Sequence, residues 1–203
     1  MLGYYRNPIN YIFFNESVIV CSLFSFGVDE VWKNGADLDD LFIKACYLAE
    51  LIKREEVLKE RITYANKPYF MSVLQRMVQQ RMITIQNGPD GKQRIKPKSS
   101  GEATMLLVGS ICWPIIDTYY IVLVFALHLC KKKDELDEKF VKDSQWIAET
   151  LFQEGKINYF ESCNQPSINN AKAQLLEMKV LVKNSLYINL APQYLKSEGE
   201  KRL

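Results

Sequence analysis

The longest apolar run of the sequence extends from Ala103 to Cys130. A helix that spans a membrane needs about 20 apolar residues with no charge among them. Pro114 and Asp117 interrupt this run near its middle, where a proline bends a helix and a carboxylate is costly to place in a bilayer. The pattern therefore favours a core helix, kinked near Pro114, over a membrane span. Whether residues 103–130 contact a membrane or another subunit stays open.

The rest of the sequence is mostly helical in its pattern. Residues 9–26 form a strongly apolar run that Gly27 ends. Over residues 38–52 apolar side chains recur at helical spacing, and Asp37 is placed to cap this helix. Prolines and serines mark further helix starts, and a glycine marks a further end. These helices are expected from Pro68 to about residue 78, from Ser99 or Ser100 to about Lys131, from Phe140 to Gly155, and from Pro166 to Met178.

Two pairs of short stretches have the spacing of β-strands instead. Residues 82–87 and 92–96 flank the turn-forming cluster Asn87–Gly91, and residues 180–182 and 187–190 form a second pair near the end of the sequence. Each pair follows a helix, as the hairpin of a winged helix does. We therefore expect a mainly α fold, namely a helical bundle with two small winged-helix-like β-hairpin units.

The length of 203 residues corresponds to one domain or two small ones, at roughly 150 residues per domain. The hydrophobic share of 48% and the charged share of 25% are typical of a globular protein. We expect residues 1–133 to form a helical region with the first winged-helix-like unit. Residues 134–203 are expected to form the second unit and a charged tail, the whole packed as one compact body.

The charge balance gives little reason to expect binding to nucleic acid. The 26 Lys and Arg residues exceed the 24 Asp and Glu residues by a net charge of only +2. Lys92, Arg94 and Lys96 alternate on one face of the first hairpin, where they could contact phosphates or form a solvated edge. We favour the solvated edge, and a regulatory module that binds nucleic acid is the weaker alternative.

Candidate catalytic residues are few. The single histidine, His128, excludes a multi-histidine metal site, and Asp134 is its nearest partner for acid–base chemistry. The two residues are six positions apart, so on one helix their side chains would point about 120° away from each other. We expect His128 to be a core histidine and Asp117 to be a buried hydrogen-bonded group or a partner of the Pro114 kink. No catalytic residue, cofactor site or metal site is therefore expected.

The cysteines and the N-terminal residues indicate an intracellular protein. The five cysteines form no CxxC pair, and four of them have apolar neighbours, which predicts buried free thiols in a reducing compartment. The first residues show neither the pattern of a secretory signal peptide nor that of an Arg-rich transit sequence. The cysteines are Cys21, Cys46, Cys112, Cys130 and Cys163.

Four short runs resemble one family in the order in which that family has them. Tyr4–Ile9 is similar to the "YYRN" that follows the catalytic domain of glycerol-3-phosphate and dihydroxyacetone-phosphate acyltransferases. Trp113–Tyr120, Gly155–Ser162 and Ser167–Ala171 resemble three later segments of that family. Within the first run, Arg6 and Asn7 could hold a phosphate or could bind backbone groups, and we favour the structural role.

The resemblance implies the helical C-terminal region of such an enzyme without its acyltransferase domain. The family's catalytic His and Asp have four residues between them, whereas five residues lie between His128 and Asp134. The family's Gly-rich substrate-phosphate segment has no counterpart in this sequence. We therefore expect a non-catalytic accessory subunit of a larger assembly, associated with the mitochondrial membrane where relatives work, with other protein subunits as partners. The alternative is part of a glycerol-3-phosphate acyltransferase whose catalytic domain is supplied elsewhere.

Overall fold

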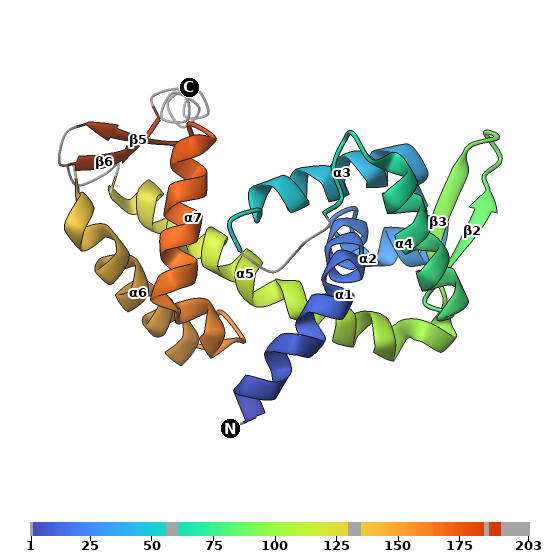
Figure 1. Cartoon of the computed structure of the whole chain (residues 1–203), viewed down its shortest axis with the longest axis horizontal. Coiled ribbons are helices and arrows are strands. Elements are labelled where there is room, and N and C mark those ends of the chain that lie inside the picture. The colour runs from blue at the N-terminus through green and yellow to red at the C-terminus, as the bar shows by residue number, and fades with distance from the viewer. Residues whose placement is uncertain (1, 56–60, 130–134, 185–186, 192–203) are drawn as a thin grey trace. The chain divides into compact units, whose positions relative to one another are not determined.

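The computed structural model describes residues 2–55, 61–129, 135–184 and 187–191 (Figure 1). Helices dominate these residues, which confirms the predicted mainly α fold, while the likeness to winged helices stays a prediction. The helices are α1 (Leu2–Phe24), α2 (Val28–Asn34), α3 (Leu38–Leu51), α4 (Lys67–Gln79), α5 (Glu102–Leu129), α6 (Asp137–Gln153) and α7 (Gln165–Glu177), with the 3₁₀ turns η1 (Ser99–Gly101) and η2 (Phe160–Cys163). The strands are β1 (Ala36–Asp37), β2 (Ile83–Asn87), β3 (Gln93–Pro97), β4 (Glu135–Leu136), β5 (Leu181–Asn184) and β6 (Tyr187–Leu190).

Backbone contacts divide the chain into two compact units. Unit 1 comprises the described residues up to Leu51 and from 61 to Trp113, and unit 2 comprises Ile52–Glu55 and the described residues from Pro114 onward. The division falls inside α5, at Pro114. The boundary predicted between residues 133 and 134, and the predicted charged tail, both lie outside the described residues.

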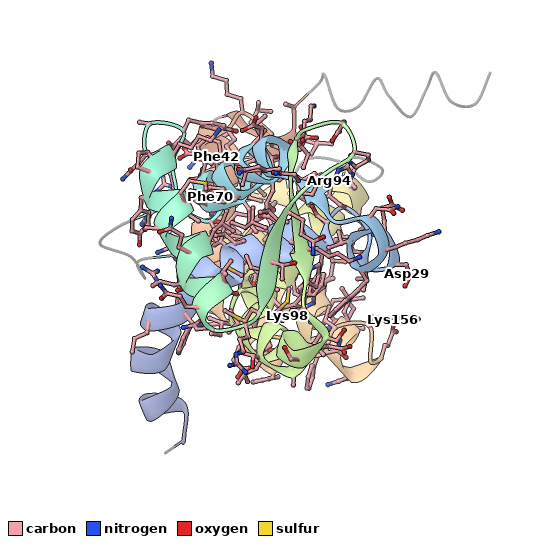
Figure 2. All side chains as sticks on the ribbon, turned by 90° about the vertical axis from the view of Figure 1, so that its right-hand side faces the viewer. Asp29, Phe42, Phe70, Arg94, Lys98 and Lys156 are labelled. Carbon is pink, nitrogen blue, oxygen red and sulfur yellow. The ribbon has the colours of Figure 1, made fainter. Side chains whose placement is uncertain are left out.

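In unit 1, side-chain caps fix where two helices begin. The backbone N–H groups of Asp39 and Asp40 donate to Asp37 Oδ1 over 2.9 Å and 3.2 Å, which confirms Asp37 as the predicted cap of α3. The side chain of Asn66 caps α4 by accepting from the N–H of Tyr69. The two helices contribute Phe42 and Phe70 to the core, and these rings lie 5.1 Å apart, close together in Figure 2. Local capping thus sets the start of each helix, and aromatic packing joins them.

Each unit contains one small antiparallel sheet of the same topology. In unit 1 the strand order is β1-β3-β2, and Ile95 of β3 faces Ala36 on one side and Ile85 on the other. In unit 2 the order is β4-β6-β5, and Ile188 of β6 occupies the matching place. Both isoleucines are fully buried, so the central strand of each sheet anchors it to its own core.

The two units also repeat the same helix-to-hairpin connection. Both α4 and α7 have 13 residues and a proline in the first turn. After each helix comes a residue of positive φ, Arg81 at 60° and Lys179 at 56°. The next residue donates its N–H back to the helix, Met82 to the carbonyl of Met77 and Val180 to that of Leu175. The order strand–helix–helix–hairpin therefore occurs twice, with the same turn chemistry.

A tight approach at Gly101 leads to a first prediction. A Cβ atom at this position would lie 2.4 Å from the Arg81 carbonyl oxygen and 2.6 Å from the Met82 Cα, both backbone atoms. We expect Gly101→Ala to lower the free energy of unfolding by about 2 kcal/mol, because the backbone must move to admit the methyl group. Urea unfolding of this variant and of Ser100→Ala, an exposed neighbour, provides the comparison. Equal stability of the two variants would contradict the close contact.

Candidate functional site

The structure does not support an acid–base site around His128. This residue is exposed in the last turn of α5, so its prediction as a core histidine is wrong. Its neighbour Leu127 is exposed as well, so these two residues of the last turn of α5 are not part of the core. Asp134 lies outside the described residues, and those residues contain no cluster of His, Cys, Asp and Glu able to hold a metal ion.

The hydrogen bonding around Pro114 of α5 uses a different side chain from the one expected. The hydroxyl of Thr118 contacts the Pro114 carbonyl at 2.9 Å and the Ser162 carbonyl at 3.1 Å, and it is buried within unit 2. Asp117 is half-buried, its Oδ2 has no hydrogen-bond partner, and burial raises its pKa to about 6. Thr118, rather than Asp117, is thus the partner of the Pro114 carbonyl.

The three cations of the first hairpin are directed at acceptors of the protein itself. Lys92 Nζ lies 3.9 Å from Asp37 Oδ2, and Arg94 Nη2 lies 3.2 Å from Asp90 Oδ2. Lys96 donates to the Lys33 carbonyl over 2.9 Å. These contacts fit the solvated edge expected for this hairpin better than a row of cations presented to phosphates.

The described cysteines are buried free thiols, as predicted. Cys21, Cys46, Cys112 and Cys163 are all buried and form no disulfide bond, while Cys130 lies outside the described residues. Burial raises the pKa of Cys46 to about 11, which keeps it a thiol at neutral pH. These side chains therefore contribute packing rather than nucleophilic chemistry.

Unit 1 contains a polar network that the sequence did not reveal. Glu16 of α1 is buried, and its Oε1 accepts from Arg76 Nη2 at 3.0 Å and Arg76 Nε at 3.1 Å. On the same two helices, Asn15 donates to the Tyr69 hydroxyl over 3.0 Å. The Arg76 side chain is 45% exposed, so a buried carboxylate here meets a solvent-accessible guanidinium. Such an ion pair links two helices but is no sign of catalysis by itself. Its sequence signal was the pair Asn15–Glu16 inside an apolar run.

Helices α1 and α5 cross closely in unit 1. The hydroxyl of Ser17 donates to the Gly109 carbonyl over 3.4 Å and accepts from the Cys112 N–H at 3.0 Å. A Cβ atom at Gly109 would lie only 3.1 Å from Val20 Cγ1. Because Gly109 has no side chain, the two helices can approach closely here. The face of α5 that contains Gly109 is therefore covered by α1.

Another face of the same helix segment presents apolar side chains to solvent. Leu106 is 59% exposed, Leu107 70% and Trp113 41%. Leu106 and Trp113 are seven positions apart, so they lie on nearly the same face of α5. We call these three residues the α5 surface. Exposed apolar side chains grouped in this way mark an interaction site more often than isolated ones do.

By length and composition, α5 is apolar enough to cross a membrane. The most apolar 18-residue window of Ser99–His128 has a mean hydropathy of 1.7, and 44% of that window is buried inside the protein. Among the described residues, Ile12–Phe24 with Val28–Asn34 passes the same test only as a pair, bent by 93°. A buried core helix and a membrane helix both meet this criterion, so it leaves the question of membrane contact open.

Unit 2 has exposed aromatic residues on α6 and η2. Trp146 is 68% exposed and Phe160 62%. The Phe160 ring packs against Phe152 with ring centroids 5.4 Å apart, which holds it in place.

The exposed position of Trp146 has a counterpart in unit 1. In the strand registers of the two sheets, Ala36 of unit 1 corresponds to Glu135 of unit 2. Trp146 then corresponds to Tyr47, which is also exposed.

Comparison with known families gives one match. The family model of the glycerol-3-phosphate acyltransferase C-terminal region matches residues 1–184. This confirms the resemblance, whose later runs lie in α5, in the stretch that follows α6 and enters η2, and in α7. The first run lies in the opening turns of α1, and the side chains of Arg6 and Asn7 are outside the described part of the structure. No curated protein matches the sequence closely enough to be named beside it.

Proposed function

This chain belongs to the glycerol-3-phosphate acyltransferase C-terminal region family, and we propose on this basis that it acts as a non-catalytic accessory subunit. In this proposal it belongs to a larger, membrane-associated mitochondrial assembly. Its contribution is a surface for other protein subunits rather than a reaction centre. The membrane and the mitochondrion follow from what the family resemblance implies. The alternative is that it is part of a glycerol-3-phosphate acyltransferase in glycerolipid synthesis, with the catalytic domain supplied elsewhere.

The observation that carries the proposal is the α5 surface. Leu106 and Leu107 both expose most of their apolar side chains to water. Burying a leucine side chain stabilises a structure by about 2 kcal/mol, so leaving these two exposed forgoes that free energy. A protein or lipid partner that covers them recovers that free energy. The non-catalytic part is supported by the sequence, because no His-x4-Asp motif occurs in these 203 residues.

The first experiment identifies the partners. The endogenous protein is purified from gently solubilised membranes, and the proteins that travel with it are identified by mass spectrometry. We expect a large complex without a polypeptide that bears an acyltransferase motif. If that polypeptide is present instead, or if the residues are part of one longer chain that carries it, the accessory role is overturned. An assay with acyl-CoA and glycerol 3-phosphate then measures the enzyme of which this region is a part.

A matched pair of variants tests the α5 surface directly. We expect Leu106→Gln/Leu107→Gln to lower the amount of co-purified partner at least tenfold, because two apolar contacts are lost while glutamine keeps the helix. Ile43→Gln is the control, because Ile43 is 53% exposed on α3 of the same unit but lies outside this surface. Recovery of partner is measured against the recovery of the chain itself. Equal losses in both variants would show that the α5 surface is not the contact.

A further inference from the structure

The short segment Ile52–Glu55, which directly follows α3 in the chain, is anchored to α7 by charged side chains. Its contacts assign it to unit 2, although the residues up to Leu51 belong to unit 1. Lys53 and Arg54 both pair with Glu177 at the C-terminal end of α7, Arg54 Nη2 lying 2.7 Å from Glu177 Oε2. Ile52 is buried beside them. These contacts hold two consecutive side chains, Lys53 and Arg54, against α7.

The next residue, Glu55, is held at the other end of the same helix. Its carboxyl group is hydrogen-bonded to the side chains of Ser167 and Asn170, in the N-terminal half of α7. Its Oε1 is buried without a hydrogen-bond partner. Asn170 and Glu177 are seven positions apart, or about 10 Å along the helix axis. The segment is therefore fastened at two points of α7, one an ion pair and the other a partly buried carboxyl group with one fully buried oxygen.

We propose that Ile52–Glu55 is a proton-dependent clasp on α7, tightened when the Glu55 carboxyl group is protonated and loosened when it ionises. A buried oxygen without a donor is tolerated in a neutral carboxyl group. In a carboxylate the same oxygen is charged. It has lost its hydrogen bonds to water and receives none from the protein, which raises the free energy of the docked state. Ionisation therefore disfavours the docked position of the segment, whereas the neighbouring ion pairs favour it.

Burial is the dominant influence on the pKa of Glu55. Burial raises the pKa of Glu55 from 4.5 to about 7, against the opposing effect of the hydrogen bonds from Asn170 and Ser167. From α5, Tyr119 faces it as a buried phenol, whose pKa is raised by burial and then by the charge of Glu55. Hydrogen bonds from Lys53 and Arg54 lower the pKa of Glu177, so the ionic end of the clasp stays charged at neutral pH.

The direction of the pH effect follows from these values. An undocked Glu55 titrates near 4.5 and the docked one near 7, so docking takes up a proton between these two pH values. Docking is strongest below about pH 4.5 and weakens about tenfold per pH unit up to pH 7. Above pH 7 both states are ionised and the docking constant levels off.

Hydrogen exchange of the full chain tests the clasp. Peptides that contain residues 52–55 are followed by mass spectrometry from pH 5 to pH 8, after correction for the intrinsic exchange rates. We expect their protection to fall on the order of 100-fold across this range, with a plateau above about pH 7. Protection that does not change with pH would overturn the proposal.

Two variants identify the titrating group. In Glu55→Gln the position cannot ionise, so we expect protection of the segment to be constant from pH 5 to pH 8. In Glu177→Gln the ionic anchor is weakened, so we expect lower protection at every pH with the wild-type pH dependence retained. If Glu55→Gln keeps that dependence, or Glu177→Gln abolishes it, Glu55 is not the proton-dependent part. The second variant keeps the test decisive if the first does not fold.

Discussion

Replacement of Arg76 by alanine is expected to lower the free energy of unfolding by about 3 kcal/mol at neutral pH. Glu16 is buried, and Arg76 supplies both hydrogen bonds that its Oε1 receives, at 3.0 Å and 3.1 Å. Without the guanidinium, a carboxylate remains inside unit 1 with no counterion, and its Oε2 already lacks a partner. The loss therefore exceeds what the ion pair itself contributes. Urea unfolding followed by circular dichroism measures it.

An exposed ion pair on the same helix provides the control. Lys67 pairs with Asp39 where both side chains are largely exposed, so Lys67→Ala should cost less than about 1 kcal/mol. Glu16→Gln added to Arg76→Ala should restore part of the loss, because the buried group is then neutral. If Arg76→Ala is no more destabilising than Lys67→Ala, Glu16 is not the constrained buried charge described for unit 1.

The Glu16–Arg76 pair shows where sequence reasoning ends. Asn15 and Glu16 are visible as polar residues within an apolar run, and they argue against a membrane span. Their partners come from α4, about 60 positions later, as with Arg76. No local pattern indicates which cation meets a given buried carboxylate, because that choice depends on how the helices pack. The existence of a buried polar group was predictable, and its network was not.

Local chemistry was the more predictable part of the fold. Asp37 caps α3 as expected, and α7 begins beside Pro166, since capping and proline geometry depend on neighbouring residues alone. The sequence missed α2, where residues 28–34 have too few turns to show a period. It also missed β1 and β4, because a strand of two residues shows no alternation. Helix α1 begins at Leu2 rather than at residue 9, where the apolar run starts.

Exposure along α5 was beyond local prediction for a related reason. The helix is apolar around most of its circumference, so its sequence does not distinguish the face at Gly109 from the face at Leu106 and Leu107. In the structure α1 crosses the Gly109 face, while Leu106 and Leu107 remain exposed to solvent. His128 was misplaced by the same reasoning, since apolar neighbours in sequence do not ensure burial.

Replacement of Phe140 by alanine is expected to lower the free energy of unfolding by about 4 kcal/mol. Phe140 on α6 is fully buried in unit 2, and its ring lies 5.0 Å from that of Phe125, centroid to centroid. Alanine removes the aromatic contact and leaves a cavity that the surrounding helices fill only in part. Thermal or urea unfolding of the purified variant measures the loss.

Trp146→Ala on the same helix is the matched control. Trp146 loses even more side-chain atoms than Phe140 does, but it is 68% exposed, so its removal should change the free energy of unfolding by less than about 0.5 kcal/mol. The contrast separates burial from the size of the side chain, since both variants shorten an aromatic residue to alanine in one helix. A large loss for Trp146→Ala would mean that the residue is covered in solution, by a second copy or another part of the chain. The exposed aromatic residues of unit 2 would then be an interface already occupied in the isolated protein.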